Sequence, residues 1–211
     1  MRRAIRWTGR TFILLGMTML FFVVYETWGT SEITHHHQSV LAEEFDPQLA
    51  RAPEAPETPT VRSTKPTVRP RVRERTPIAR IIIPKIGLSV IVVQGTTLGD
   101  LAYGPGHYVE TPMPWELGPT GIAGHRTGWS QPFYHLDLVG VGDMIYLKTT
   151  HGKFSYRVTK TFVVEPKDTW VLNGNPNSKA QQQLVLTTCT PAHTSLHRLI
   201  VWADLVPSPG A

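Results

Sequence analysis

The chain has 211 residues, with 21 Lys and Arg, 16 Asp and Glu, and a formal net charge of +5 at pH 7. This length allows one medium-sized domain plus accessory segments. The basic residues gather before an apolar run near the N-terminus and between residues 51 and 80. Neither cluster is interleaved with aromatic residues on a folded surface, which argues against nucleic-acid binding. The single cysteine, Cys189, excludes an internal disulfide.

The N-terminal segment has the composition of a membrane anchor. Residues 11–25 are uncharged and apolar, and the stretch from residue 7 to 28 reaches the roughly 20 residues that cross a bilayer. The arginines before it predict a cytoplasmic N-terminus. A cleaved signal peptide is the alternative, but Glu26-Thr27-Trp28 offers no small-residue cleavage site. We therefore predict a cytoplasmic tail and retained signal-anchor helix over residues 1–30, with the bulk of the chain outside the membrane.

Residues 31–76 are rich in Pro, Thr, Glu and Arg. Such a composition buries too little apolar area to order itself, and the prolines keep the chain extended. We expect a disordered Pro-rich stalk here. The run His35-His36-His37 within it reads as an accidental polar stretch of a linker rather than a metal site.

From residue 77 onward, short apolar β-branched runs alternate with turns that contain Gly, Pro or Asn. The runs that predict strands cover residues 78–83, 88–93, 120–123, 144–149, 154–164, 184–188 and 199–205. A helical turn is expected at 97–102, a short strand or extended piece at 168–172 and a helical turn at 178–182. Helical periodicity is almost absent, so we predict one all-β domain over residues 77–211, built as a closed or nearly closed β-barrel.

Cys189 stands between the last two predicted strands. A buried strand leads into it, and the turn that follows contains Pro191, which cannot continue a ladder. Arg198 begins the next strand, so pairing of the two strands would bring its guanidinium back toward the sulfur. A thiol at the end of a strand, where a loop begins and a cation is held nearby, is a candidate nucleophile. The alternative is that Cys189 is a small buried hydrophobe of the core.

Cysteine-dependent cleavage of a peptide also needs a proton donor for the leaving amine and a group that steadies the developing oxyanion. His125 is a candidate donor, because it follows Gly124 in a loop of small residues that leaves room for its ring. His107, His193 and His197 are rival bases. Sequence spacing does not choose among them, since such partners are brought together by the fold.

These segments resemble the sortase family, and within it the class E housekeeping enzymes of actinobacteria. The resemblance rests on the anchor, the Pro-rich segment and motifs that follow the family's order: Gly104-Pro105-Gly106-His107-Tyr108, Ala123-Gly124-His125-Arg126-Thr127, Pro132-Phe133, Gly142-Asp143, Leu186-Thr187-Thr188-Cys189-Thr190-Pro191 and Arg198-Leu199. It implies an eight-stranded sortase-type barrel with short helical turns, and a cysteine transpeptidase. The sequence shows no convincing acidic cluster for the calcium site that some sortases have, so we expect no metal or cofactor.

By that resemblance, Cys189 attacks the Thr–Gly bond of a sorting signal of LAXTG or LPXTG type, LAXTG being the class E form. His125 protonates the leaving amine, and Arg198 positions the substrate or steadies the oxyanion. The thioacyl enzyme then passes the protein to an amine of a peptidoglycan precursor. Thr187, Thr188 and Ala123 are the expected substrate-binding residues. Since neighbouring strand residues face opposite sides, only one of the two threonines points inward.

Two further readings stay open. A membrane-tethered β-domain can bind a cell-wall component without catalysis, with Cys189 as core filler. An endopeptidase would use the same thiol chemistry with water as the acceptor.

Overall fold

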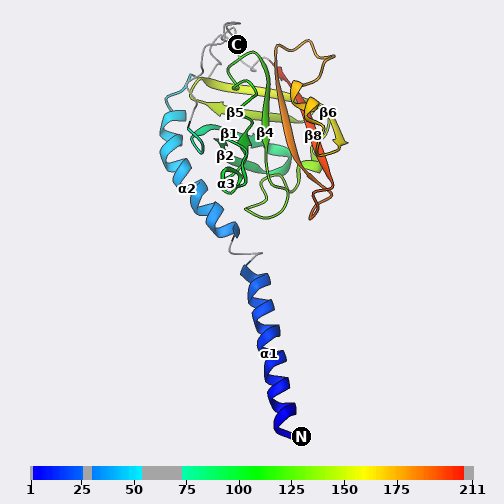
Figure 1. Cartoon of the computed structure of the whole chain (residues 1–211). Helices are drawn as coiled ribbons and strands as arrows, with labels where there is room; N and C mark the ends of the chain where they lie inside the picture. Colours follow the sequence, from blue (N-terminus) through cyan, green and yellow to red (C-terminus); the bar gives the residue numbers. More distant parts are fainter. Residues whose placement is uncertain (1, 26–29, 54–72, 207–211) are drawn as a thin grey trace.

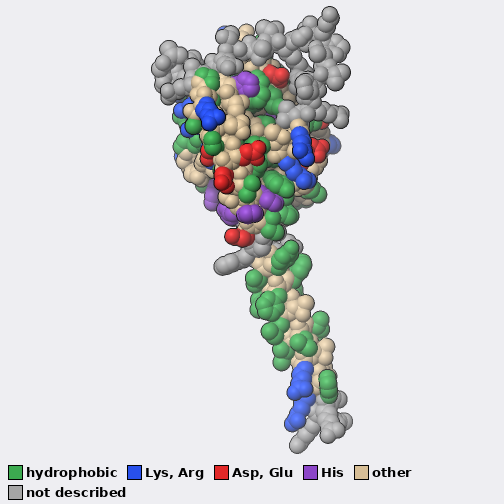
Figure 2. Space-filling model, turned by 90° about the vertical axis from the view of Figure 1, so that its left-hand side faces the viewer, with side chains coloured by type: hydrophobic (Ala, Val, Ile, Leu, Met, Phe, Trp, Pro, Cys, Tyr) green, Lys and Arg blue, Asp and Glu red, His purple; other side chains and the backbone are tan. Residues whose placement is uncertain are grey.

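The computed structural model describes residues 2–25, 30–53 and 73–206. Helix α1 (Arg2–Val24) opens the chain. Within it, residues 6–24 form the one helix of the described chain that is long and apolar enough to cross a membrane. Figure 2 shows apolar side chains along this helix and basic ones near its start. This composition suits a membrane anchor.

The expected eight-stranded closed barrel is confirmed. Its strands are β1 (Pro77–Ile83), β2 (Leu88–Gln94), β3 (Gly106–His107), β4 (Gly118–Ala123), β5 (Met144–Thr149), β6 (Gly152–Val164), β7 (Gln182–Thr190) and β8 (His197–Val206). Neighbouring strands follow the order β1-β2-β3-β4-β7-β8-β6-β5 and close on themselves. β4 and β7 pair in parallel, and β7 and β8 form an antiparallel pair beside them. β7 therefore lies between β4 and β8, on the side of the barrel where Figure 1 labels these two strands.

The apolar alternation of the strands fills the barrel. In β7, Leu184 and Leu186 belong to the buried core cluster, together with residues such as Phe154 and Tyr156 of β6. The alternate residue Val185 belongs instead to a second buried cluster on the outer face, with Ile200 and Trp202 of β8 among its members. Because side chains alternate along a strand, Thr187 and Cys189 share this outer face.

Short helices lie in the connections: η2 (Pro84–Ile86), α3 (Leu98–Leu101), η3 (Leu136–Leu138) and η4 (Thr169–Asn173). The helical turn expected at 97–102 is present as α3, where Thr97 and Asp100 form a capping box. The strand expected at 168–172 is wrong, since those residues enter the 3-10 helix η4. The helical turn expected at 178–182 is also wrong, because residues 178–181 are irregular and Gln182 begins β7. The two-residue strand β3 lies in a segment where the sequence predicts no strand.

The largest correction concerns the N-terminal segment. A disordered stalk was expected from residue 31, but residues 30–49 form helix α2 (Thr30–Leu49). Its buried residues, Thr34, Leu41 and Phe45, recur with helical spacing. Leu41 and Phe45 pack on Ile91 and Val93 of β2, so α2 lies against the barrel wall (Figure 1). Residues 54–72 of the expected stalk lie outside the described residues.

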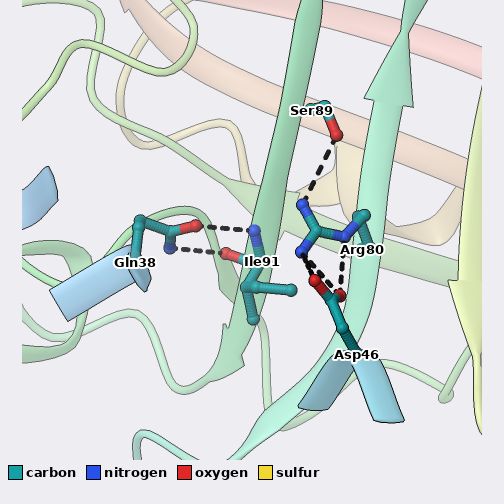
Figure 3. A network of polar contacts seen from close by, with 5 residues as sticks. All are labelled: Gln38, Asp46, Arg80, Ser89 and Ile91. Atoms are coloured by element: carbon teal, nitrogen blue, oxygen red, sulfur yellow. Dashed lines mark hydrogen bonds and ion pairs between the residues drawn. The ribbon is translucent and has the colours of Figure 1, made fainter. Parts of the chain in front are cut away.

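Two polar contacts fix α2 in place. The Gln38 side chain accepts from the backbone N–H of Ile91 at 2.7 Å and donates to its carbonyl at 3.0 Å. Asp46 receives two bonds from the Nη2 of Arg80 on β1, at 2.6 and 2.8 Å. Figure 3 shows Gln38 and Arg80 on opposite sides of the strand that carries Ile91. Since β3 pairs with β2 only at Val93 and Gln94, Gln38 supplies the partner that the short strand leaves missing.

Candidate active site

Cys189 and Arg198 are placed by the barrel itself. They are directly paired residues in the ladder between β7 and β8, at the end where both strands meet the connecting turn. Directly opposed residues of an antiparallel pair have their side chains on the same face of the sheet. The ladder therefore places the start of the Arg198 side chain opposite Cys189, on the same face of the sheet.

A cavity of about 370 Å³ opens next to the sulfur. One part of its wall consists of His125, Arg126 and Thr127, which follow β4. Cys189 and residues 193–195 of the turn after β7 form another part. Cys189 and His125, which are far apart in sequence, thus line one cavity.

The backbone around His125 is fixed on both sides. The N–H of Gly124 donates to the carbonyl of Thr187 at 3.1 Å, and the N–H of Phe133 donates to the carbonyl of His125 at 3.1 Å. A Cβ at Gly124 would lie 2.5 Å from a carbon of the buried Phe133 ring. Only glycine fits there, which explains the small residue before the histidine.

The His125 ring is in a poorly solvated position. Its Nε2 atom is buried without a hydrogen-bond partner among the described residues. Burial lowers the pKa of His125 from its ordinary value of 6.5, because the charged imidazolium is the form that loses hydration. The ring is therefore neutral at pH 7 and presents an uncommitted nitrogen.

The rival histidines are less suitable. His107 is fully buried, and its two ring nitrogens lie 3.0 Å from the Gln94 side chain and 3.0 Å from the Pro112 carbonyl. His197 is exposed and pairs with Thr190 in the ladder. His193 lines the cavity, but it is exposed on the turn after β7. His125 combines a buried ring nitrogen with a place in the cavity wall.

Arg198 holds the turn that follows Cys189. Its Nη1 donates to the carbonyls of Ser195 and His197, each at 3.1 Å. The side chain lines a separate cavity of about 80 Å³, which also contains Tyr108 and Thr187. The hydroxyls of Tyr108 and Thr187 are 2.9 Å apart. These contacts place Arg198 between the turn after Cys189 and a small polar recess on the outer face.

The expected substrate-binding residues lie on two different faces. Ala123 pairs with Thr187 between the parallel strands β4 and β7, so both occupy the face that carries Cys189. Thr188 does not fit a substrate-binding position, because its buried hydroxyl donates to the carbonyl of Gly124 at 2.8 Å. This hydrogen bond connects β7 to the residue before His125, so Thr188 holds the His125 loop against β7.

Arg126 is a site residue that motif reading did not single out. Its side chain is only 7% exposed, and its Nη2 lies 2.8 Å from a carboxylate oxygen of Asp137. Its Nη1 donates to the Thr190 hydroxyl at 3.1 Å. Arg126 thus connects the loop of His125 to the strand end of Cys189. A charged residue next to the histidine was visible in the sequence, but its burial was not.

The residues after Arg126 adopt unusual backbone angles. Trp129, Ser130 and Gln131 have φ values of 47°, 60° and 48°, directly after Gly128 at 73°. Non-glycine residues rarely occupy this left-handed region, and successive ones are costly.

Among the described residues, no group of three or more His, Cys, Asp and Glu side chains is placed to hold a metal ion.

The comparisons with known proteins agree with this architecture. Residues 81–206 match the sortase domain model. The chain is 31% identical to Sortase SrtE1 of Streptomyces coelicolor over 96% of its own length and 57% of that protein, and 29% identical to Sortase SrtE2 of the same organism over 97% and 83%. The chain thus spans just over half the length of SrtE1.

Solved structures show the same similarity. The structure of a Clostridium perfringens Sortase D5 transpeptidase superposes with a TM-score of 0.65 at 30% identity, over 81% of this chain and 99% of that one. Sortase E1 from Streptomyces coelicolor, solved with a tripeptide in the active site, gives a TM-score of 0.58 at 33% identity, over 62% and 88%. With the domain match covering more than half of its residues, the chain belongs to the sortase family.

Proposed function

We propose that this protein is a cysteine transpeptidase that cleaves the Thr–Gly bond of a sorting signal and joins the new carboxyl end to a cell-wall amine. The observation that carries the proposal is the cavity shared by Cys189 and His125, whose partial burial keeps its ring neutral at pH 7. Membership of the sortase family supports it. The apolar helix α1 supports a membrane-anchored enzyme with its barrel outside the cell.

The first half of the reaction uses one proton that Cys189 and His125 exchange. Neutral His125 accepts the proton of the Cys189 thiol, and the thiolate attacks the threonine carbonyl. The resulting imidazolium donates the same proton to the glycine nitrogen as the C–N bond breaks. The products are a thioacyl enzyme and a free amine, with His125 neutral again.

The second half reverses these roles. The amine of the acceptor attacks the thioacyl carbonyl, His125 takes up the proton that the amine loses, and the Cys189 sulfur leaves and is reprotonated. A ring that is neutral at pH 7 suits both halves, because it must accept a proton before it can donate one. Water in place of the amine would give hydrolysis.

Arg198 is the proposed stabiliser of the substrate or of the oxyanion. Its Nη1 is bonded to two turn carbonyls. Its Nε and Nη2 bond no other described residue, so the planar fork can donate to carbonyl oxygens of a bound peptide. We place the peptide along the outer face, over Ala123 and Thr187 and beside the recess with Tyr108.

The similarity to class E enzymes favours a signal of LAXTG type. The test incubates the full chain in detergent with an LAXTG or LPXTG peptide, with and without a glycine-based amine, and follows products by mass spectrometry. We expect cleavage between Thr and Gly, transfer to the amine, a preference for LAXTG and no product with Cys189→Ala. Equal hydrolysis with and without amine would indicate an endopeptidase. Intact peptides from folded enzyme would indicate a binding domain.

A further inference from the structure

The start of α2 and the loops around the candidate active site lie at the same end of the folded domain. A cavity of about 510 Å³ is lined by Thr34, His35 and Gln38 from the first turns of α2 and by Ser130 and His135 from the loop that follows His125. Figure 1 shows the start of α2 and the turn between β7 and β8 at the lower end of the domain, with the C-terminus at the upper end. The entry point of the chain and the catalytic loops are therefore neighbours.

Helix α2 is firmly attached to the barrel. Its side of the contact includes the buried Leu41 and Phe45 and the bidentate Asp46–Arg80 pair. Gln38 bonds both backbone groups of Ile91 (Figure 3). These contacts fix the orientation of the barrel relative to the axis of α2.

Only residues 25–29 separate α1 from α2. An extended residue spans at most about 3.6 Å, so the start of α2 lies within roughly 20 Å of the last turn of α1. Because α1 has the length and composition of a membrane span, the end of the domain that carries the catalytic loops is held near the bilayer. A flexible stalk of the length expected from the sequence would have imposed no such restriction.

The loops at this end expose apolar side chains. Leu138, three residues after His135 of the large cavity, is 58% exposed, and Leu196 in the turn before β8 is 66% exposed. The two loops are adjacent, since the rings of Tyr134 and His193 are 6.4 Å apart. Leucine on the water-facing tips of loops suits the boundary between lipid headgroups and acyl chains. We call Leu138 and Leu196 the apolar rim.

We propose that the catalytic end of the barrel faces the bilayer that α1 spans, with the apolar rim resting in its headgroup region and α2 fixing this orientation. This goes beyond transpeptidation, because it concerns how the site is presented. Its consequence is that membrane-bound reactants reach the Cys189 cavity from the lipid side.

The test measures the distance of two labelled positions from lipid. Since Cys189 is the only cysteine, the full chain with Cys189→Ala accepts a single new cysteine, either Leu196→Cys in the rim or Thr150→Cys in the exposed turn between β5 and β6. Each protein is labelled with a fluorophore and reconstituted into vesicles of phosphatidylcholine and phosphatidylglycerol that contain nitroxide lipids. We expect strong quenching at position 196 and little at 150. Equal quenching at both positions, or none at 196, would overturn the proposal.

A second variant tests the part played by α2. Gln38→Ala combined with Asp46→Ala removes its two polar attachments, and quenching at position 196 should fall toward the value at 150. Unchanged quenching, with the domain still folded by circular dichroism, would remove α2 as the element that sets the orientation. Neither measurement requires catalysis, so its result is independent of whether the peptide is cleaved.

Discussion

Cys189 and Arg198 are directly opposed partners in the ladder between β7 and β8. Opposed Cβ atoms of an antiparallel pair lie about 4.5–5.5 Å apart, so this pairing holds the start of the Arg198 side chain on the same face as the thiol. The turn is in return held by Arg198, which bonds the carbonyls of Ser195 and His197. One side chain thus links the ladder to the wall of the Cys189 cavity.

Arg198→Lys should reduce kcat/KM for a sorting-signal peptide by roughly 10²–10³-fold, the typical loss on removing an oxyanion donor. A lysine keeps the charge but cannot bond the turn carbonyls and the peptide through one planar fork. The matched control is Arg157→Lys, at an exposed position of β6, which should leave turnover unchanged. Steady-state kinetics with peptide and amine would check this, and near-normal turnover in Arg198→Lys would remove Arg198 from the oxyanion role.

Stability should fall in acid because of His125. Burial lowers its folded-state pKa below the ordinary 6.5, so the unfolded chain binds the proton more tightly and protonation favours unfolding. This loss of folding stability from His125 is absent above about pH 6.5, and it grows as pH falls from there to the folded-state pKa. Urea denaturation of the protein and of His125→Asn between pH 7.5 and 5 would measure it, and the variant should lose less stability over this range.

The same titration should shape catalysis. Neutral His125 must accept the thiol proton, so kcat/KM should decline on the acid side with an apparent pKa below 6.5. The variant His193→Asn, at an exposed position, should show the same decline of kcat/KM at low pH. Loss of this decline in His193→Asn, and its persistence in a residually active His125→Asn, would transfer the proton role to His193.

Arg126→Met should destabilise the protein by about 1–3 kcal/mol, because it leaves the Thr190 hydroxyl without its donor and removes the ion pair of a buried guanidinium. The partner Asp137 is 49% exposed, which keeps the expected effect below that of a fully buried pair. The exposed pair of Lys167 and Glu165 provides the control, and Glu165→Gln should change stability by less than about 0.5 kcal/mol.

A positioning effect of Arg126 would also appear in the kinetics. Displacement of the His125 loop relative to Cys189 should lower kcat more than it raises KM. Arg126→Lys retains the charge near Asp137 and should recover stability better than kcat. Equal kcat for Arg126→Met and the parent protein would show that the contact is only structural.

Much of the barrel was predictable from local patterns. Runs such as 144–149 match β5 residue for residue because alternation and flanking turns define such a strand within a few residues. The two-residue β3 was not predictable, since its pairing with β2 and β4 depends on distant strands. The stretch 168–172 failed for a similar reason: the buried Val171 packs on Val185, Ile200 and Trp202 as part of a 3-10 turn.

The sequence predicted which residues form the candidate site but not how they lie relative to one another. Cys189, His125 and Arg198 each stand beside recognisable turn or strand signals, while the shared cavity of Cys189 and His125 arises only on folding. Helix α2 was missed because half of its contact face is polar. Thr34 and Gln38 read as linker residues, although they donate to the carbonyls of Ala102 and Tyr103 in the folded protein.

Gln38→Ala should destabilise the protein by about 1–3 kcal/mol, the typical penalty for buried polar groups that lose their partners. The change leaves the N–H and carbonyl of Ile91 without the amide that completes β2. Gln48→Ala is the matched control in the same helix, since the Gln48 amide bonds only the exposed carbonyl of Glu44, and it should alter stability by less than about 0.5 kcal/mol. Thermal unfolding of both variants would decide: equal melting temperatures would mean that α2 contributes nothing to the barrel, whereas a lower one for Gln38→Ala alone would make α2 part of the folded domain.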